Sequence, residues 1–169
     1  MGEFTDMGAG ETFRRIAYAV EWTAERVDGL RWAARLARAH HAELLLLLVV
    51  PPPTPLFETE SPAKAEAELA LALLLEKLET LGLTSKAFLL TGTGSVDRQI
   101  ARAADSARVD LIVIEEPRQS WLGRLLAGRL AARVIARAHC PVLVIPRDAK
   151  RSAWTRIVLA TEKEHHHQN

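Results

Sequence analysis

The sequence predicts an α/β protein built on a doubly wound parallel sheet with helices on both faces. Apolar runs of strand length alternate strictly with segments whose apolar residues repeat at helical spacing, which favours parallel strands joined by right-handed helical crossovers. One run, Glu43 to Val50 (ELLLLLVV), is apolar throughout after its first residue, as expected for a central strand covered on both faces. The 169 residues suffice for one domain with short appendages.

Each predicted element carries a local signal. Strands are short apolar runs, and helices have apolar residues every three or four positions. Prolines between residues 51 and 55 predict a loop, Ser61 and Pro62 predict a helix start, and Gly82 predicts a helix end. The predicted elements are, in order, strand Arg15 to Val20, helix Ala24 to His40, strand Glu43 to Val50, helix Pro62 to about Leu81, strand Lys86 to Leu90, helix Val96 to Ala107, strand Asp110 to Ile114, helix Arg124 to Ala138 and strand Pro141 to Pro146.

The domain is expected to occupy residues 13–147, preceded by a flexible leader (1–12) and followed by a tail (148–169). In the tail, Thr155 to Thr161 (TRIVLAT) resembles Arg14 to Val20 (RRIAYAV): a basic residue followed by an apolar run. This segment is either an extra edge strand or the first strand of a second copy of the domain. The sequence leaves both interpretations open.

Composition excludes several classes of partner. With 22 basic and 21 acidic residues the formal net charge is +1, which gives no single-sign field for nucleic acid or anionic lipid. The longest apolar stretch, Leu44 to Val50, is far shorter than the roughly 20 residues needed to cross a bilayer. The single Cys140 cannot form an internal disulfide. We therefore expect a cytoplasmic protein without nucleic-acid or membrane partners.

The residues that could carry chemistry have simpler structural interpretations. Cys140 and His139 are adjacent, which suggests a nucleophile, but neighbouring strand residues point to opposite faces, so a buried and inert thiol is favoured. The run His165 to His167 resembles a tag and fixes no coordination geometry, so no native metal is assigned. Walker A, HExxH, nucleophile-elbow and GxGxxG motifs are absent. We expect no catalysis.

Three segments resemble the universal stress protein family. These are RIAYAV near the start, DLIVI at 110–114 and RLLAGRLAARVIARAHCPVLVIP at 124–146, and the match covers Phe13 to Pro146. The resemblance implies an adenine nucleotide alpha hydrolase-like sheet of order 3-2-1-4-5 with an ATP site, in ATP-binding members, at the carboxyl ends of strands one and four. It also implies a homodimer formed through the fifth strand, by Val142, Leu143, Val144 and Ile145.

In this sequence, the segment that aligns with the family's ATP-binding loop departs from the family pattern. The family loop reads G-x-x-G, nine residues, then G-[S/T], and its glycines let backbone amides approach the phosphates. Aligned on Gly128, the two other glycine positions hold Glu115 and Arg118, and the final hydroxyl position holds Arg129. Pro117 also removes one amide donor. Because Glu115 adds negative charge beside a triphosphate, we expect standard ATP binding to be lost.

Other candidate ligand contacts lie at the ends of the first two strands. The family's Asp-Gly-Ser after strand one appears as Glu21-Trp22-Thr23, and an indole at a glycine position could fill the adenine side of the crevice. Conversely, Arg118, Arg124 and Arg129 suit phosphate oxygens, unless they are solvated helix residues. The candidate nucleotide-binding residues are Glu21, Thr23, Val49, Val50, Glu115, Arg118, Gly128 and Arg129.

These patterns favour a non-enzymatic, dimeric universal-stress-type domain that acts in the stress response through contacts with a protein partner. We expect no bound cofactor, ATP being the ligand to test. One alternative is a sensor that binds ATP or AMP through arginines in the loop after strand four. Another is a regulatory half of a tandem protein, suggested by the segment at 155–161.

Overall fold

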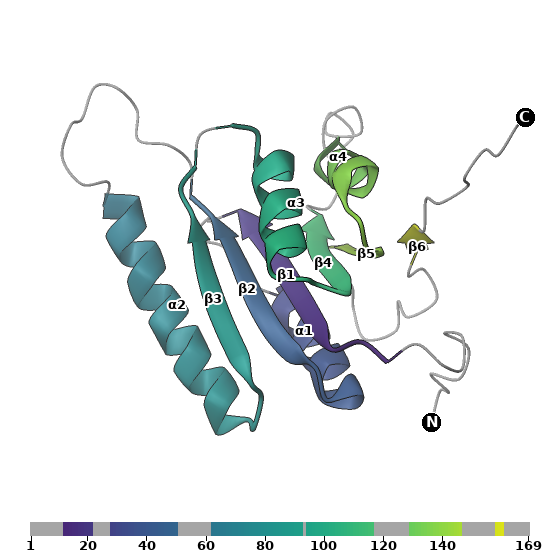
Figure 1. The fold of residues 1–169 in the computed structure, drawn as a ribbon. Helices are drawn as coiled ribbons and strands as arrows, with labels where there is room; N and C mark the ends of the chain where they lie inside the picture. Colours follow the sequence, from purple (N-terminus) through teal and green to yellow (C-terminus); the bar gives the residue numbers. More distant parts are fainter. Residues whose placement is uncertain are drawn as a thin grey trace, which may run out of the picture.

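The computed structural model describes residues 12–21, 28–50, 62–92, 94–116, 129–146 and 158–160, and its centre is a six-stranded sheet (Figure 1). The strands lie in the order β3-β2-β1-β4-β5-β6. The elements are β1 (Arg15–Glu21), α1 (Asp28–His40), β2 (Glu43–Val49), α2 (Pro62–Thr80), β3 (Ser85–Leu90), α3 (Val96–Ser106), β4 (Leu111–Glu116), α4 (Arg129–Arg137), β5 (Val142–Pro146) and β6 (Val158–Ala160).

The first five strands form the predicted parallel sheet, in the order 3-2-1-4-5 that the family resemblance implies. β1 lies at its centre, where Tyr18 is the register partner of Leu46 in β2 and of Val113 in β4. The chain winds outward from β1 to β2 and β3 on one side and crosses to β4 and β5 on the other. The strand order therefore reverses between β1 and β4.

The helices form two layers, one on each face of the sheet. α1 and α2 cover one face, and α3 and α4 cover the other (Figure 1). Because successive strand residues point to opposite faces, each strand contributes to two separate cores. Tyr18 packs in the core under α1 and α2, while its neighbour Ala19 packs in the core under α3 and α4.

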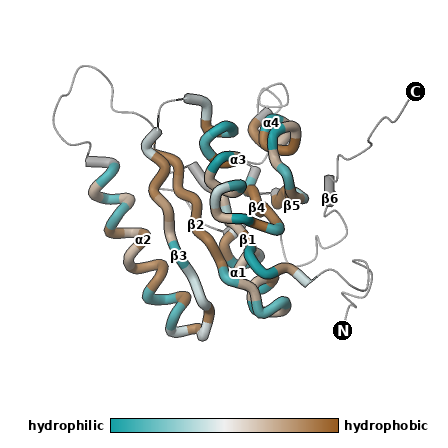
Figure 2. Tube along the Cα trace, in the orientation of Figure 1, coloured by the Kyte–Doolittle hydropathy of each residue, from teal (hydrophilic) through white to brown (hydrophobic). Residues whose placement is uncertain are grey.

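The strands differ in hydrophobicity according to their position in the sheet. Residues 44–49 of β2 are all buried, because both faces of this strand are covered and strands flank it on both sides. β3 lies at the sheet edge, and its Lys86 and Phe88 are exposed on the face opposite α2. Figure 2 shows β2 as a continuous hydrophobic strand, as the sequence predicts for a central position.

Local signals place the ends of α2 correctly. Pro62 is its first residue, where a missing N–H costs nothing. Gly82 has φ +75° and follows the last turn, and the N–H of Leu83 donates to the carbonyl of Leu78 at 3.0 Å. A side chain at Gly82 would strain this left-handed cap. Among the described residues, no helix has the length and apolar character needed to span a membrane.

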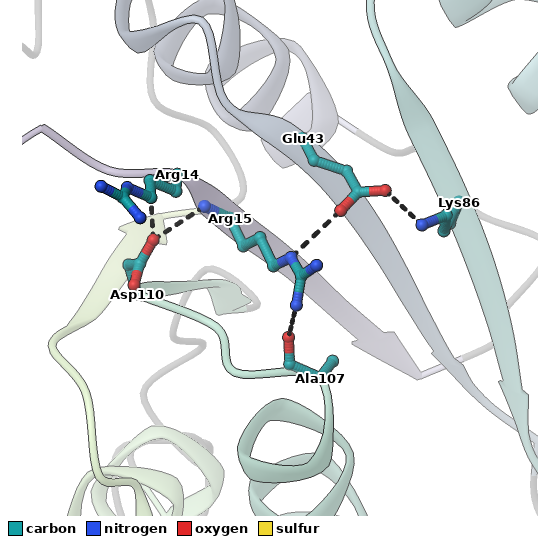
Figure 3. A network of polar contacts seen from close by, with 6 residues as sticks. All are labelled: Arg14, Arg15, Glu43, Lys86, Ala107 and Asp110. Atoms are coloured by element: carbon teal, nitrogen blue, oxygen red, sulfur yellow. Dashed lines mark hydrogen bonds and ion pairs between the residues drawn. The ribbon is translucent and has the colours of Figure 1, made fainter.

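A polar network ties four strands together at the amino end of the sheet (Figure 3). The Asp110 carboxylate accepts from the backbone N–H groups of Arg14 and Arg15, at 2.6 and 2.8 Å. The Arg15 side chain contacts Glu43 at 3.2 Å and donates to the Ala107 carbonyl at 2.8 Å. Lys86 of β3 lies 2.6 Å from the other oxygen of Glu43.

This network also sets the ionisation of Glu43. The hydrogen bond from Lys86 is the strongest influence on the Glu43 pKa and lowers it; partial burial opposes this effect, and the charges of Lys86 and Arg15 add to it. The net result is a pKa below the ordinary value. At the amino end of the sheet, the cationic partners Lys86 and Arg15 therefore favour the charged form of Glu43.

β6 adds a sixth strand, which the five-stranded prediction did not include in the sheet. It pairs antiparallel with β5, so that β5 lies between β4 and β6. β6 falls within residues 155–161, the segment that the sequence left as either an edge strand or the start of a second repeat. In this structure β5 is not the sheet edge, and the expected dimer strand has an intramolecular neighbour.

Candidate functional site

The reversal point between β1 and β4 lies where the sheet, α1 and the chain after β4 meet. Parallel strands end together at one edge, and in doubly wound sheets ligands bind outside the carboxyl ends at such a point. β1 ends at Glu21 and β4 at Glu116, and α1 begins with Asp28 after the chain leaves β1. A ligand site is therefore expected at this edge of the sheet.

Glu115 is the buried polar residue at this edge, with only 8% of its surface exposed. Its Oε2 accepts a hydrogen bond from the Tyr18 hydroxyl at 2.7 Å and another from the backbone N–H of Gly29 at 2.9 Å. One carboxylate oxygen thus joins β4 to β1 and to α1. Tyr18 and Glu115 meet because both point to the face of the sheet that α1 covers.

The contact with Gly29 places the carboxylate at the start of a helix. Gly29 is the second residue of α1, where backbone N–H groups have no partner within the helix. The helix dipole also favours negative charge here, so helix starts commonly bind phosphates and other anions. Glu115 supplies this anion from within the chain.

Gly29 allows the carboxylate to approach so closely. A Cβ at this position would lie 2.9 Å from Glu115 Oε2, 2.9 Å from Tyr18 Cε2 and 3.1 Å from Glu115 Cβ. Contacts below 3.0 Å are essentially never made by real Cβ atoms. A residue with a side chain would force Glu115 or Tyr18 away, which explains a glycine inside the first turn of a helix.

The structure brings part of the predicted nucleotide site to this edge. Glu21 is the last residue of β1 and the register partner of Val49, the last residue of β2. The side chains of Val49 and Val50 are buried in the two cores, so only their backbones could contact a ligand. The N–H of Val50 already donates to the Leu90 carbonyl at 3.0 Å.

The remaining predicted site residues lie mainly outside the described part of the chain. Thr23, Arg118 and Gly128 belong to segments that the structure does not describe. Arg129 is the first residue of α4, and its side chain is likewise outside the description. The prediction that these residues bind a nucleotide stays a prediction.

The sequence reasoning missed Tyr18 and Gly29, which both donate hydrogen bonds to Glu115. Each carried a weak signal. Tyr18 is the only tyrosine of the chain and interrupts an otherwise aliphatic strand, and Gly29 lies in the predicted helix at a cost of about 1 kcal/mol relative to alanine. Their common partner lies 97 and 86 positions away, so neither signal identified it.

A second buried carboxylate, Asp97, joins α3 to α4. It lies in the first turn of α3 with 1% of its surface exposed. The Arg137 Nε donates to Asp97 Oδ2 at 2.6 Å, and Arg133 Nε lies 3.4 Å from Oδ1. Burial is the largest influence on the Asp97 pKa and raises it, but hydrogen bonds from Arg137 and Ser95 outweigh burial, and the net pKa is lowered.

Cys140 has the environment of an unreactive thiol. It is half-buried beside the core under α3 and α4, rather than fully buried as expected. Burial, followed by the negative charge of Asp110, raises the pKa of the thiol to about 11, so the thiolate nucleophile is scarce at neutral pH. Within the described residues, no group of three His, Cys, Asp or Glu side chains could hold a metal ion.

Comparisons with known proteins agree with this architecture. The sequence profile of the Universal stress protein family matches residues 12–146. A universal stress protein of Methanocaldococcus jannaschii is 42% identical over 52 residues, an alignment that spans 31% of this chain and 31% of that protein.

Solved structures extend the similarity to most of the fold. A universal stress protein from Archaeoglobus fulgidus superposes with a TM-score of 0.62 at 26% identity, covering 78% of this chain and 93% of that one. A structure from the same organism in complex with dAMP gives 0.60 at 24% identity, with 80% and 99% coverage. One from Pseudomonas aeruginosa gives 0.61 at 20% identity, with 78% of this chain but 43% of that one. With a profile match over most of its length and this sheet order, the chain belongs to the universal stress protein family.

Proposed function

We propose that this chain is a non-enzymatic stress-response domain of the cytoplasm that binds ATP weakly or not at all and acts through contacts with a protein partner. The observation that carries the proposal is the Glu115 carboxylate, which accepts the Gly29 N–H at the start of α1. At this edge of the sheet, an anion provided by the chain occupies a helix start that could otherwise face a ligand phosphate.

Electrostatics support weak binding of ATP. A phosphate placed about 4 Å from a carboxylate is repelled by about 4 kcal/mol at an effective dielectric constant of 20, or about a thousandfold in affinity. Displacing Glu115 instead would deprive a buried charge of the donors Tyr18 and Gly29. Either route opposes the binding of a triphosphate.

Exposed apolar residues support a role in protein contacts. Leu69 and Leu73 lie one turn apart on α2 and are 64% and 59% exposed. Figure 2 shows hydrophobic residues along much of α2. Phe88 of β3 is also exposed. We further propose homodimerisation through β5, whose four residues Val142 to Ile145 are all apolar.

Calorimetric titration with ATP, with and without Mg²⁺, tests the proposal. We expect the wild-type chain to show no binding up to about millimolar ATP. Glu115→Gln keeps the size of the side chain and removes its charge, and we expect it to raise the affinity at least tenfold. Glu79→Gln, on an exposed position of α2, changes the net charge equally and serves as the control. Micromolar binding by the wild-type chain would contradict the proposal.

The nucleotide-sensor alternative rests on the Archaeoglobus fulgidus structure solved in complex with dAMP, which shares this fold. In that case, arginines after β4 would replace the glycine amides of the family loop. Arg118→Ala and Arg129→Ala would then abolish nucleotide binding. Unchanged affinity in both variants would exclude this use of the arginines.

A tandem arrangement is the other alternative. The Pseudomonas aeruginosa structure is more than twice as long as the region this chain matches, since the chain covers 43% of it. The likeness of residues 155–161 to residues 14–20 fits such an arrangement. The complete gene provides the test, because a second DLIVI-to-PVLVI pattern downstream would establish the repeat and its absence would exclude it.

A further inference from the structure

β6 uses the side of β5 that faces away from β4. Its three residues pair antiparallel with β5, matching Val142 with Ala160, Leu143 with Leu159 and Val144 with Val158. The opposite side of β5 is filled by β4 through five parallel pairs. Figure 1 shows β6 beyond β5 at this end of the sheet, opposite the end formed by β3 and α2.

We propose that this side of β5 accepts one strand at a time, and that β6 of the same chain and β5 of a second copy compete for it. The proposal rests on the homodimer proposed above. The backbone groups of β5 alternate in direction, and those that point away from β4 form a single row. A partner strand needs the same row that β6 uses, so docking of β6 and dimerisation exclude one another.

The character of β5 favours a second copy as the competitor. Val142, Leu143 and Ile145 are buried, and Val144 is partly buried. The strand carries no lysine, glutamate or other charge that would repel a second strand. In an antiparallel pair of two such strands related by a two-fold axis, apolar residues would face apolar residues along the whole pair.

Because β6 is short, a second strand could displace it from β5. β6 offers three residue pairs, whereas β1 and β2 form seven and β4 and β5 form five. Dimerisation is weakened when β6 occupies the site in part of the molecules. Because both copies must free β5, the apparent dissociation constant equals the intrinsic constant divided by the square of the competent fraction. If β6 occupies the site in nine of ten molecules, the dimer is weakened about a hundredfold.

Proline substitution in β6 tests the competition. Successive N–H groups of a strand point to opposite sides, so Val158→Pro combined with Leu159→Pro removes at least one donor that faces β5. Val158→Ile with Leu159→Val keeps both donors and the strand propensity and is the matched control. We expect the dimer dissociation constant from analytical ultracentrifugation to fall at least tenfold in the proline variant and to stay unchanged in the control.

A reversible disulfide lock between β5 and β6 gives a second measurement, which does not depend on proline. In a Cys140→Ala background, Val144→Cys with Val158→Cys places thiols on register partners of β5 and β6. Once oxidised, this variant should remain at the monomer mass of 18.7 kDa and should dimerise after reduction. Circular dichroism checks that each variant is folded.

The outcomes separate this inference from the proposed dimer. Equal dissociation constants for the proline variant and the wild-type chain, or a dimer of the oxidised lock, would overturn the competition and leave the dimer in place. A proline variant and a reduced lock that both stay monomeric at about millimolar concentration would overturn both proposals.

Discussion

The two ends of the sheet hold their carboxylates in different ways. At the amino end, Glu43 lies between Arg15 and Lys86, and Asp110 binds two backbone amides near the surface. At the carboxyl end, Glu115 is buried and accepts from a tyrosine hydroxyl and from the start of α1. The amino end resembles a solvated ion-pair network, whereas the carboxyl end resembles a binding site whose anion belongs to the chain.

This difference shows that the contribution of a charged residue to stability depends on its partners and on its burial. A half-exposed ion pair gains little, because water competes for both partners. A buried carboxylate is costly to leave without donors, so each donor to it contributes more. We therefore expect the fold to depend more strongly on the Glu115 contacts than on the amino-end network, and three substitutions rank the effects.

The largest effect is expected for Gly29→Ala, because the added Cβ would lie 2.9 Å from both Glu115 Oε2 and Tyr18 Cε2. Overpacking and loss of the helix-start contact together cost about 3 kcal/mol, and the better helix propensity of alanine returns about 1 kcal/mol. Urea denaturation should show a net loss of about 2 kcal/mol.

Gly92→Ala is the control for this substitution. Its added Cβ would meet only the end of the Gln99 side chain, at 3.5 Å. We expect a change within about 0.5 kcal/mol. Equal losses in the two variants would show that the contact between Glu115 and α1 contributes nothing specific.

An intermediate effect is expected for Asp97→Asn, which removes a buried carboxylate held by basic side chains, as Glu43 is at the amino end. Because the folded pKa of Asp97 is lowered, its stabilisation is present above the unfolded pKa and is lost as the pH falls through the folded pKa. The variant should be about 1.5 kcal/mol less stable at pH 7. The difference should shrink below about pH 4. A difference that stays constant down to pH 2 would contradict this assignment.

The smallest effect is expected for Glu43→Gln, which disrupts the amino-end network. The Arg15 and Lys86 side chains are 43% and 60% exposed, so the loss should be about 0.5 kcal/mol and should decrease further in 1 M salt. Thermal unfolding at low and high salt measures it. A loss larger than that of Gly29→Ala would reverse the ranking of the two ends.

The sequence was sufficient to predict the order of strands and helices. The continuous apolar run of β2, the alternating elements and the family resemblance together predicted the sheet order that the structure has. It also singled out Glu115 as a charged residue after the fourth strand, whereas the structure places Glu115 within β4 and buries it. These features are encoded locally, in hydrophobic periods of a few residues and in turn residues such as Pro62 and Gly82.

Contacts between distant segments were not predictable in the same way. Tyr18 and Gly29 lie 97 and 86 positions from Glu115, and Arg137 is 40 positions from Asp97. The charge of Glu115 alone was enough to predict that it repels a phosphate. Its hydrogen bond to α1, in contrast, depends on how β4, β1 and α1 come together in the fold. Likewise, residues 155–161 gave a strand pattern but no indication that β6 would choose β5 as its neighbour.

The Glu115 contact with α1 has a consequence for how the protein would respond to its surroundings. A protein that binds a ligand only in the folded state gains stability as the logarithm of ligand concentration, so its abundance follows the supply of that ligand. A carboxylate fixed in the chain is present at a constant effective concentration. Under the weak or absent ATP binding proposed above, the folded population of this domain would be independent of cellular nucleotide levels.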